Sequence, residues 1–237
     1  SGRWRRALAW RWAMRKVITV DGPSGVGKGT LCQSLARERG WAYLDSGALY
    51  RLLALQALAA DKVDAPAAEI AALVGAMQID FRLDEGGCTV LFNGAPVGGE
   101  LRTERCGNAA SKIAAYPEVR AALLDFQRNF AGDAPLVADG RDMGTVVFPD
   151  APLKLFLTAS AEIRAERRYK QLLAQGESVN LRAIYAEIAE RDARDRSRSV
   201  APLIPASDAV VIDTGTLSIA DVQQQVNAEI AARFSFS

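Results

Sequence analysis

The 237-residue sequence contains no histidine and only three cysteines. Without histidine there is no Ser-His-Asp triad, no histidine-ligated metal centre and no histidine general base. Cys32, Cys88 and Cys106 are odd in number, far apart and without metal-ligand spacing, so we expect reduced thiols of a cytoplasmic protein. Any chemistry must therefore rest on carboxylates, arginine, lysine and backbone amides.

The sequence also lacks an excess of charge of one sign and a long apolar run. Lysine and arginine total 29 and aspartate and glutamate 28, so the formal net charge is +1. Such a balance gives no general reason to expect a nucleic-acid or membrane partner. No apolar run approaches about 18 residues, the length that a membrane-spanning helix needs. The 49% hydrophobic and 24% charged composition is typical of a globular chain with one sizeable core and a smaller lobe.

Residues 1–13, SGRWRRALAWRWA, differ from the rest of the chain because they hold three of the four tryptophans, four arginines and no acid. Arg11 interrupts the apolar stretch that a signal peptide would need. A basic arm that binds membrane or nucleic acid is one interpretation. The interpretation that we favour is an extension, either artificial or read from an upstream start, before a single domain over residues 14–237.

Residues 17–30, VITVDGPSGVGKGT, carry the most informative motif. An apolar strand over 17–20 leads into the spacing Gly22-x4-Gly27-Lys28, and a helix is predicted over 31–39. A glycine-rich turn of this kind directs successive N–H groups and a helix N-terminus at one point, where phosphate binds. The motif predicts an ATP phosphate site formed by Gly22, Pro23, Ser24, Gly25, Val26, Gly27, Lys28, Gly29 and Thr30.

One position departs from the usual phosphate-loop pattern. Gly29 follows the lysine where Ser or Thr is usual, and the hydroxyl comes one residue later, at Thr30. The pattern therefore favours Mg²⁺ held through water over direct coordination by this hydroxyl.

The rest of the chain alternates strands with helices. Further strands are predicted at 41–45, 136–139, 153–158 and 209–213, and helices at 47–60 and 217–234, with Ser46 as the cap of the first. Asp45 is interpreted as a structural residue that fixes the start of that helix. Such alternation favours an α/β fold whose parallel sheet is covered on both faces, with ligands at the carboxyl ends of its strands.

Two segments interrupt this alternation. Residues 78–101 have period-two apolar sequence around glycine turns, which predicts antiparallel strands, flanked by helices at 66–76 and 104–115. Residues 160–198 are dense in charge. An ion-paired solvent face is the ordinary interpretation of such helices, but the excess of arginine favours a phosphate clamp. Asp192 and Arg194 are interpreted as a plain surface pair.

Polar residues follow the predicted strands in four further motifs. DSGALYR holds Ser46 and Arg51, and ADGRDMG holds Asp139, Arg141 and Asp142. SKIAAYPEVR holds Ser111 and Arg120, with Pro117 suited to the first turn of a helix. The spacing Arg191-x3-Asp195-x2-Arg198 places three side chains on one helical face.

Together these motifs resemble the bacterial cytidylate kinase family, from about Met14 to the C-terminal helix. GPSGVGKGT alone indicates only a nucleoside-monophosphate kinase, whereas DSGALYR, NAASKIAAYPEVR, DGRDMGTVVFPDAP, ERDARDR and VAPL are much more specific. The resemblance implies a P-loop three-layer fold with a five-stranded parallel sheet in the order 2-3-1-4-5. It also implies a nucleoside-monophosphate-binding insert at about 62–106 and a short helical lid at about 159–178.

The resemblance implies a monomeric (d)CMP kinase of pyrimidine metabolism that uses ATP, CMP or dCMP, and Mg²⁺. Roles carried over for phosphoryl transfer fall on Lys28, Arg141, Arg168 and Arg191, with Arg164 over adenine and Arg168 on phosphate in the ATP site. Roles in CMP binding fall on Ser46, Arg51, Ser111, Arg120, Arg141, Asp142, Arg191, Asp195 and Arg198. Asp139 would hold Mg²⁺ through water, with Thr30 as a second candidate.

Three rival functions remain open from the sequence. The first is another small-acceptor kinase, of uridylate or shikimate type, against which Arg120 and Asp142 favour cytosine. The second is a nucleotide-binding switch without a second substrate, for which a second set of arginines has little use. The third is a nucleic-acid binder, which would bind with steep salt dependence.

Overall fold

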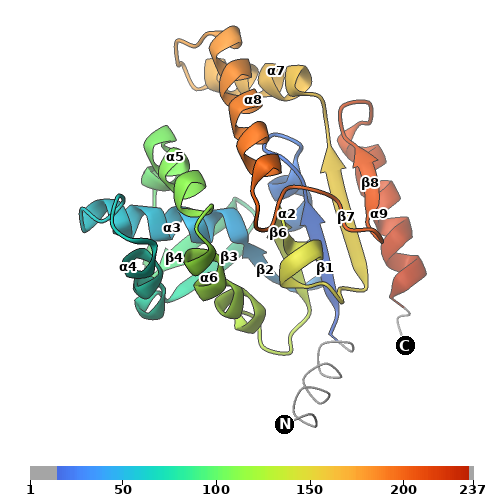
Figure 1. The fold of residues 1–237 in the computed structure, drawn as a ribbon. Coiled ribbons are helices and arrows are strands. Elements are labelled where there is room, and N and C mark those ends of the chain that lie inside the picture. The colour runs from blue at the N-terminus through green and yellow to red at the C-terminus, as the bar shows by residue number, and fades with distance from the viewer. Residues whose placement is uncertain (1–14, 235–237) are drawn as a thin grey trace. The chain divides into compact units, whose positions relative to one another are not determined.

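The computed structural model describes residues 15–234 (Figure 1). The interpretation of residues 1–13 as an extension lies outside the described residues and stays an interpretation. Within the described range, no helix is long and apolar enough to cross a membrane.

The five parallel strands predicted from the sequence form one sheet. They are β1 (Val17–Asp21), β2 (Ala42–Asp45), β6 (Leu136–Gly140), β7 (Leu153–Thr158) and β8 (Val210–Asp213). Their order is β2-β6-β1-β7-β8, and the pairs β2–β6, β1–β7 and β7–β8 are parallel. Counted along the chain within this sheet alone, that order is 2-3-1-4-5. The α/β fold class is therefore confirmed.

Burial along the strands explains their unbroken apolar sequence. Every residue of β1 and β6 is buried, and so are the first five of the six residues of β7. Because neighbouring side chains of a strand point to opposite faces, burial at every position means that both faces are covered. The polar residues of these strands therefore lie in buried surroundings.

A second, antiparallel sheet confirms the prediction for residues 78–101. It contains β3 (Ile79–Asp84), β4 (Gly87–Phe92) and β5 (Ala95–Pro96) in that order. The turn between β3 and β4 is closed by Asp84, whose Oδ1 accepts the N–H of Gly86 at 2.8 Å. Asparagine and aspartate favour such turns because their side chains bond the backbone two residues on.

The chain divides into two compact units, which we describe separately. The first, here the loop unit, covers described residues 15–32 and 140–234, and the second, the central unit, covers 33–139. Helix α2 (Lys28–Arg39) begins in the loop unit, which also contains α7 (Ala161–Ala174), α8 (Leu181–Ser197) and α9 (Ile219–Arg233). A π-helical turn, η3 (Met143–Val147), follows β6.

The central unit contains α3 (Ser46–Ala59), α4 (Ala67–Ala72), α5 (Glu104–Ile113) and α6 (Pro117–Asn129), with 3₁₀ turns at Leu73–Ala76 and Gly99–Arg102. Its core gathers around the fully buried Leu53, Ile113 and Leu123. Helix α6 begins at Pro117, as predicted, because proline suits a first helical turn whose N–H groups have no intrahelical acceptor. The start of α3 corrects a prediction: the cap is Asp45, whose Oδ1 accepts the N–H of Ala48 at 3.0 Å, and Ser46 is the first helical residue.

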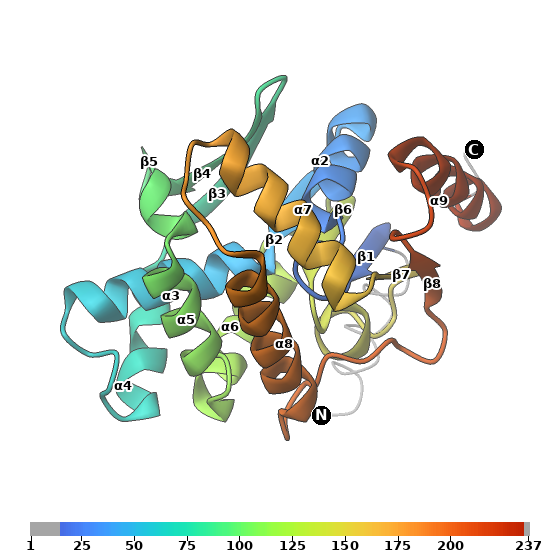
Figure 2. The same cartoon turned by 90° about the horizontal axis from the view of Figure 1, so that it is seen from above.

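In the loop unit, α7 and α8 lie side by side in both views (Figures 1 and 2). Ala165 and Leu172 of α7 pack with Ile184 of α8 in a small apolar cluster. Ser160 and Asn180 cap the two helices through their side-chain oxygens. The segment 160–198 is therefore a helical pair with its own apolar contact.

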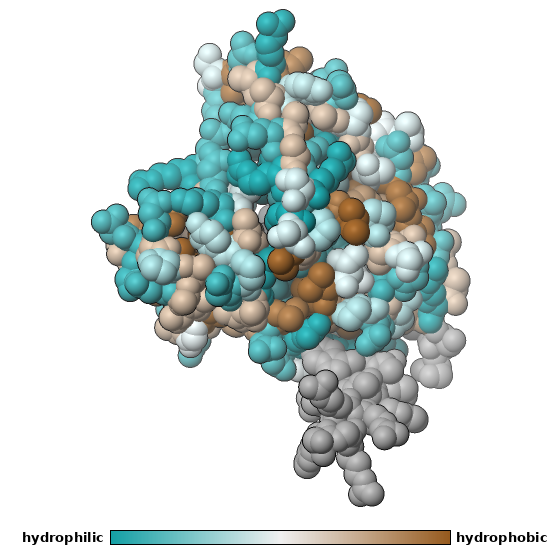
Figure 3. Space-filling model, in the orientation of Figure 1, coloured by the Kyte–Doolittle hydropathy of each residue, from teal (hydrophilic) through white to brown (hydrophobic). Residues whose placement is uncertain are grey.

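Hydrophilic residues cover most of the face seen in Figure 3.

Candidate active site

The glycine-rich loop joins β1 to α2 within the loop unit, as the sequence predicts. Gly22 has φ +151°, and a Cβ there would lie 2.3 Å from the carbonyl oxygen of Leu157, so only glycine fits. Gly25 and Gly27 have φ of +75° and +89°, in the left-handed region that glycine adopts without strain. The sequence thus dictates a tight turn that ends at Lys28, the first residue of α2.

Lys28 curls back over its own loop. Its Nζ donates to the carbonyl oxygen of Pro23 at 2.8 Å, and the residue is 9% exposed. The ammonium group and the N-terminus of α2 therefore place positive charge at the same loop. This arrangement can hold the phosphates of a nucleotide.

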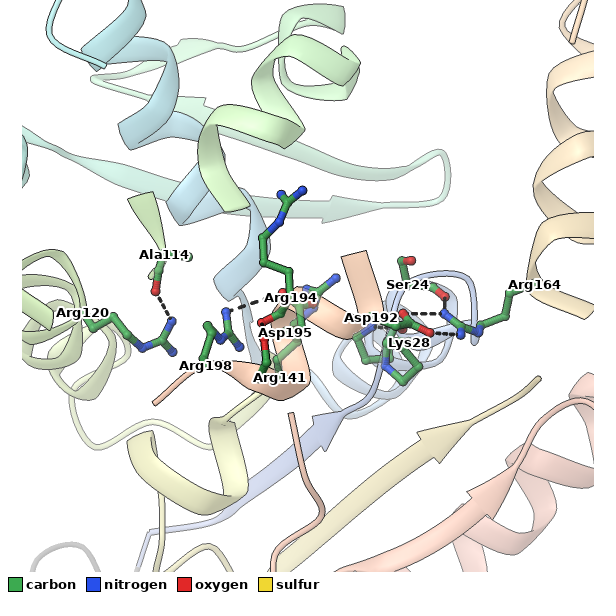
Figure 4. A network of polar contacts seen from close by, with 12 residues as sticks. Ser24, Lys28, Ala114, Arg120, Arg141, Arg164, Asp192, Arg194, Asp195 and Arg198 are labelled. Atoms are coloured by element: carbon green, nitrogen blue, oxygen red, sulfur yellow. Dashed lines mark hydrogen bonds and ion pairs between the residues drawn. The ribbon is translucent and has the colours of Figure 1, made fainter. Parts of the chain in front are cut away.

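A buried ion pair supports the loop from α7 and α8 (Figure 4). Arg164 is 2% exposed, and its two terminal nitrogens bind both oxygens of Asp192. The same guanidinium donates to the carbonyl oxygens of Ser24 and Ala159, each at 3.1 Å. Most of its donors are thereby engaged by protein groups, so Arg164 braces the loop, and the place over adenine that the resemblance implies stays a prediction.

The interpretation of Asp192 as a surface residue is wrong. Asp192 is 7% exposed because it lies on the side of α8 that meets Arg164 of α7. Arg194 does form a surface pair, with Glu190 one helical turn earlier at 3.0 Å. The density of charged residues along α8 did not show that Asp192 faces the interior while Arg194 lies at the surface.

The other arginines of α7 are exposed, and one of them was missed. Arg168 donates to Gln171 at 3.1 Å. Arg167 instead reaches the loop, donating to the carbonyl oxygen of Gly25 at 3.3 Å and to that of Thr214 at 2.6 Å. Its spacing of three residues from Arg164, on the same helical face, was the available signal.

Asp195 gathers two of the predicted arginines around it (Figure 4). Its Oδ2 accepts Nε of Arg141 at 2.6 Å, and its Oδ1 lies 3.7 Å from Nη1 of Arg198. Asp195 is 4% exposed, so one buried carboxylate holds two cations. Arg191 is half-buried on the same helix, and Asp142, next to Arg141, is 4% exposed.

The central unit carries the other residues predicted to bind CMP. Arg51 of α3 donates to the carbonyl oxygen of Leu101 at 2.6 Å, and Arg120 of α6 donates to that of Ala114 at 2.9 Å. The guanidinium of Arg120 also lies 5.4 Å from the ring centroid of Tyr50, within cation–π range. Ser46 is 3% exposed and Ser111 is half-buried. Tyr50 was missed, although it stands beside Arg51 in DSGALYR.

Asp139, the candidate for a metal, is 6% exposed near the end of β6. Its Oδ2 accepts the hydroxyl of Tyr43 at 3.2 Å, which orients the carboxylate. Among residues 15–234 there is no group of three or more histidine, cysteine, aspartate or glutamate side chains that could hold a metal. Mg²⁺ commonly keeps several waters and binds one or two carboxylates plus substrate phosphates, so a single oriented aspartate fits it.

Asp21, at the end of β1, is a residue that the sequence analysis did not single out. Its Oδ1 and Oδ2 accept the N–H groups of Met143 and Gly144, each at 2.8 Å. Burial raises the pKa of Asp21 to about 7, although these two N–H groups lower it. Asp142 raises the pKa further and Lys28 lowers it. A strand-terminal aspartate just before Gly22 was the available signal.

This pKa gives a prediction for stability against pH. Because the pKa of Asp21 is raised above 3.8 by folding, the folded chain holds this proton more tightly than the unfolded chain. The resulting stabilisation is complete below pH about 4 and is lost as the pH rises through about 7. We therefore expect the stability of the wild type, relative to Asp21→Asn, to fall over this range by roughly 4 kcal/mol, since one pKa unit corresponds to about 1.4 kcal/mol. Urea unfolding of both proteins from pH 4 to 8 measures it, and parallel curves would contradict it.

The predicted site residues are divided between the units. The loop unit holds Gly22 to Thr30, Arg141, Asp142, Arg164, Arg168, Arg191, Asp195 and Arg198, and the central unit holds Ser46, Arg51, Ser111, Arg120 and Asp139. Residues 62–106 fall within the central unit, and residues 159–178, which include α7, fall within the loop unit. The insert and the lid themselves stay predictions.

Comparison with known proteins identifies relatives over almost the whole chain. The family model described as Cytidylate kinase matches residues 18–232. A cytidylate kinase of Dichelobacter nodosus is 61% identical over 222 residues, which are 93% of this chain and 99% of that protein. One of Aeromonas hydrophila is 56% identical over 210 residues, which are 88% of this chain and 91% of that protein. An uncharacterized protein from Eubacterium ventriosum shares the fold, with a TM-score of 0.52 at 13% identity over 92% of this chain and 99% of that one.

Proposed function

The chain belongs to the cytidylate kinase family, and from this we propose that it transfers the γ-phosphoryl group of ATP to CMP or dCMP. The products are ADP and CDP or dCDP. The bond between the γ-phosphorus and its bridging oxygen breaks, and a bond forms to an oxygen of the acceptor phosphate.

The cluster of Arg141, Asp195 and Arg198 is the observation that carries this proposal. The two arginines lie in the same unit as the phosphate loop but belong to different segments, because Arg141 follows β6 and Arg198 follows α8. A switch that binds one nucleotide needs only the loop. A second group of cations, partly buried around the buried Asp195, supports a second phosphate-bearing substrate, because phosphate oxygens can bind these guanidinium groups as the carboxylate does.

On the donor side, we assign the β- and γ-phosphates to the backbone amides of the loop and to Lys28. Arg164 stabilises the loop by donating to the carbonyl oxygen of Ser24, and Arg167 and Arg168 add positive charge from α7. Residues 159–178 act as a lid, which closes over ATP and excludes water that would hydrolyse it. Asp139 would hold Mg²⁺ through water, with Thr30 as a second candidate, and the metal would supply positive charge next to the phosphates.

On the acceptor side, Arg51, Arg141 and Arg191 neutralise the CMP phosphate, and Ser46 binds beside them. Arg120, Ser111 and Asp142 read the cytosine edge, and Asp195 and Arg198 contact ribose and phosphate. Cytosine presents an amino donor beside two acceptors, which a carboxylate and a guanidinium complement. Uracil would turn an oxygen toward Asp142, leaving a buried carboxylate against an acceptor.

No general base is needed for this reaction. The attacking group is a phosphate oxygen that is already ionised at neutral pH, so catalysis consists of positioning and of neutralising charge. Arginine, lysine and backbone amides are sufficient for both tasks. The proposal is therefore consistent with a chain that has no histidine.

Asp142→Asn tests the base-reading role. We expect this change to weaken the preference for CMP over UMP by about 1–3 kcal/mol, the worth of one well-formed base contact. The ratio of kcat/KM for the two acceptors measures it. Asp150→Asn, an exposed position a few residues on, is the control and should leave the ratio unchanged. An unaltered ratio in Asp142→Asn would remove Asp142 from the base-reading set.

An acceptor panel tests the function itself. ADP release is measured with ATP and Mg²⁺ against CMP, dCMP, UMP, AMP and shikimate. We expect fast turnover with CMP and dCMP and slow turnover with UMP. Preference for UMP or shikimate would support the rival small-acceptor kinases. Tight ATP binding without turnover would support the nucleotide switch.

We further propose that the enzyme acts as a monomer in the cytoplasm. None of the three cysteines forms a disulfide, which fits a reducing compartment. Light scattering coupled to size-exclusion chromatography measures the mass directly. A mass near 25.5 kDa is expected, and a multiple of it would contradict the monomer.

A further inference from the structure

We propose that Asp21 is a positioning residue for the acceptor side of the reaction. Asp21 directly precedes the phosphate loop, and its carboxylate binds the turn that follows Arg141 and Asp142. The inference rests on the proposed function, because it assigns these two residues to CMP. It adds a residue that precedes Gly22, the first residue assigned to the ATP phosphates, and that lies outside every group that we assign to substrate.

The geometry of the turn carries this inference. Asp21 ends β1, and the loop begins at the next residue, Gly22. Its two oxygens accept the N–H groups of Met143 and Gly144, each at 2.8 Å, and all four groups belong to the loop unit. The carbonyl oxygen of Asp142 accepts the N–H groups of Val146 and Val147 in the same turn. A shift of Asp21 would therefore be passed directly to Asp142 and Arg141.

A carboxylate is the group that this position requires. The two N–H donors reach different oxygens, so both oxygens must accept. Asparagine offers one oxygen and one NH₂ group, and the NH₂ would face an N–H group. Met143 is fully buried, so water cannot easily replace the lost partner. We expect the turn of an Asp21→Asn variant to move.

The surroundings of Asp21 indicate that this carboxylate is held for its geometry. Asp21 is 4% exposed, and burial of its charge raises its pKa to about 7. The charged groups that act on it are Asp142, which raises the pKa, and Lys28, which lowers it. Ionisation of Asp21 thus costs the folded state free energy, yet the carboxylate accepts two N–H groups of the turn and lies within electrostatic range of Asp142 and Lys28, one residue from each side of the proposed reaction.

The neighbouring strand limits where the turn can lie. A Cβ on Gly144 would come within 2.9 Å of Oγ1 of Thr19 and 3.2 Å of Cδ of Lys154. Thr19 is on β1, two residues before Asp21, and Lys154 is on β7. The turn is therefore held against β1 by the carboxylate and by close packing. Alanine at 144 would push it away while leaving Asp21 intact.

Steady-state kinetics of Asp21→Asn test the proposal. We expect the KM for CMP to rise about tenfold, the scale of one lost hydrogen bond to a charged group, and the CMP-over-UMP ratio to fall. The KM for ATP should stay within about twofold, because the loop glycines and Lys28 are unchanged. Asp213→Asn is the matched control, since Asp213 also ends a parallel strand and accepts a glycine N–H, that of Gly215 at 2.8 Å. It should leave both KM values unchanged.

A pH profile adds a readout that a merely structural role would not move. CMP itself titrates near pH 6, so the informative quantity is the ratio of KM for CMP between variant and wild type. This ratio should grow as the pH rises from 6 to 8, because ionised Asp21 accepts both N–H groups with charged oxygens, whereas the hydroxyl oxygen of protonated Asp21 is a weaker acceptor. A ratio that does not change with pH would overturn the positioning role.

Gly144→Ala and Gly144→Ala/Thr19→Ala keep the proposal testable if Asp21→Asn does not fold. The single variant should raise the KM for CMP, and the double variant should largely restore it. An equal rise in the KM for both substrates, or no rise in a folded variant, would overturn the inference. Wild type that does not phosphorylate CMP would instead contradict the proposed function, so the two failures are distinguishable.

Discussion

Lys28→Ala is expected to lower kcat by roughly 10³-fold, the upper range for removing one preorganised group that stabilises transition-state charge. Lys28 begins α2 and folds over the glycine loop, with its ammonium 2.8 Å from the carbonyl oxygen of Pro23. In the proposed reaction it neutralises charge on the β- and γ-phosphates, where negative charge must be held during transfer. Single-turnover measurement of CDP formation reports this loss directly.

Two controls separate this effect from a loss of folding. The circular dichroism spectrum of Lys28→Ala should match that of the wild type, because the glycines that define the loop are retained. Lys62→Ala, which breaks only the exposed pair with Glu69, should keep full activity. A rate for Lys28→Ala close to that of the wild type, with unchanged ATP affinity, would contradict the assignment of the loop.

Asp192→Ala is expected to destabilise the protein by about 3–5 kcal/mol, because it leaves the charge of Arg164 buried without its carboxylate. Arg164 is 2% exposed and binds both oxygens of Asp192. The free energy of unfolding in urea measures the loss. Arg164 also donates to Ser24 of the loop, so we expect weaker ATP binding as well.

Glu190→Ala is the matched control, since it breaks the exposed i,i+4 pair with Arg194 on the same helix. Such a pair is worth about 0.3–0.5 kcal/mol. The double variant Arg164→Met/Asp192→Leu should be more stable than Asp192→Ala, because it removes both charges from the interior. Equal losses in Asp192→Ala and Glu190→Ala would show that the Arg164–Asp192 pair is not buried in solution.

Local sequence was sufficient to predict the parts of the fold that depend on neighbouring residues. The Gly22-to-Lys28 spacing, the proline that opens α6 and the glycine turns of the antiparallel sheet each act within a few residues. The strand order 2-3-1-4-5 was implied by the family resemblance. Local sequence does not indicate it, because the strands that lie next to each other in the sheet are far apart in the chain. The structure confirms that order.

The contacts that sequence reasoning missed join distant segments of the chain. Asp21 and Gly144 are 123 positions apart, so the place of Asp21 just before Gly22 could mark this residue but not its partner. Arg164 was singled out through the family resemblance, which did not indicate its buried pair with Asp192. On α8, charged residues occupy nearly every side of the helix, so Asp192 and Arg194 looked alike until α7 was in place.

The products of the reaction test the central claim most directly. Purified protein is mixed with ATP, Mg²⁺ and CMP, and nucleotides and inorganic phosphate are quantified by chromatography. The proposed mechanism predicts ADP and CDP in equal amounts, without phosphate release. ADP accompanied by inorganic phosphate, with CMP unchanged, would contradict phosphoryl transfer to CMP and indicate a protein that only hydrolyses ATP.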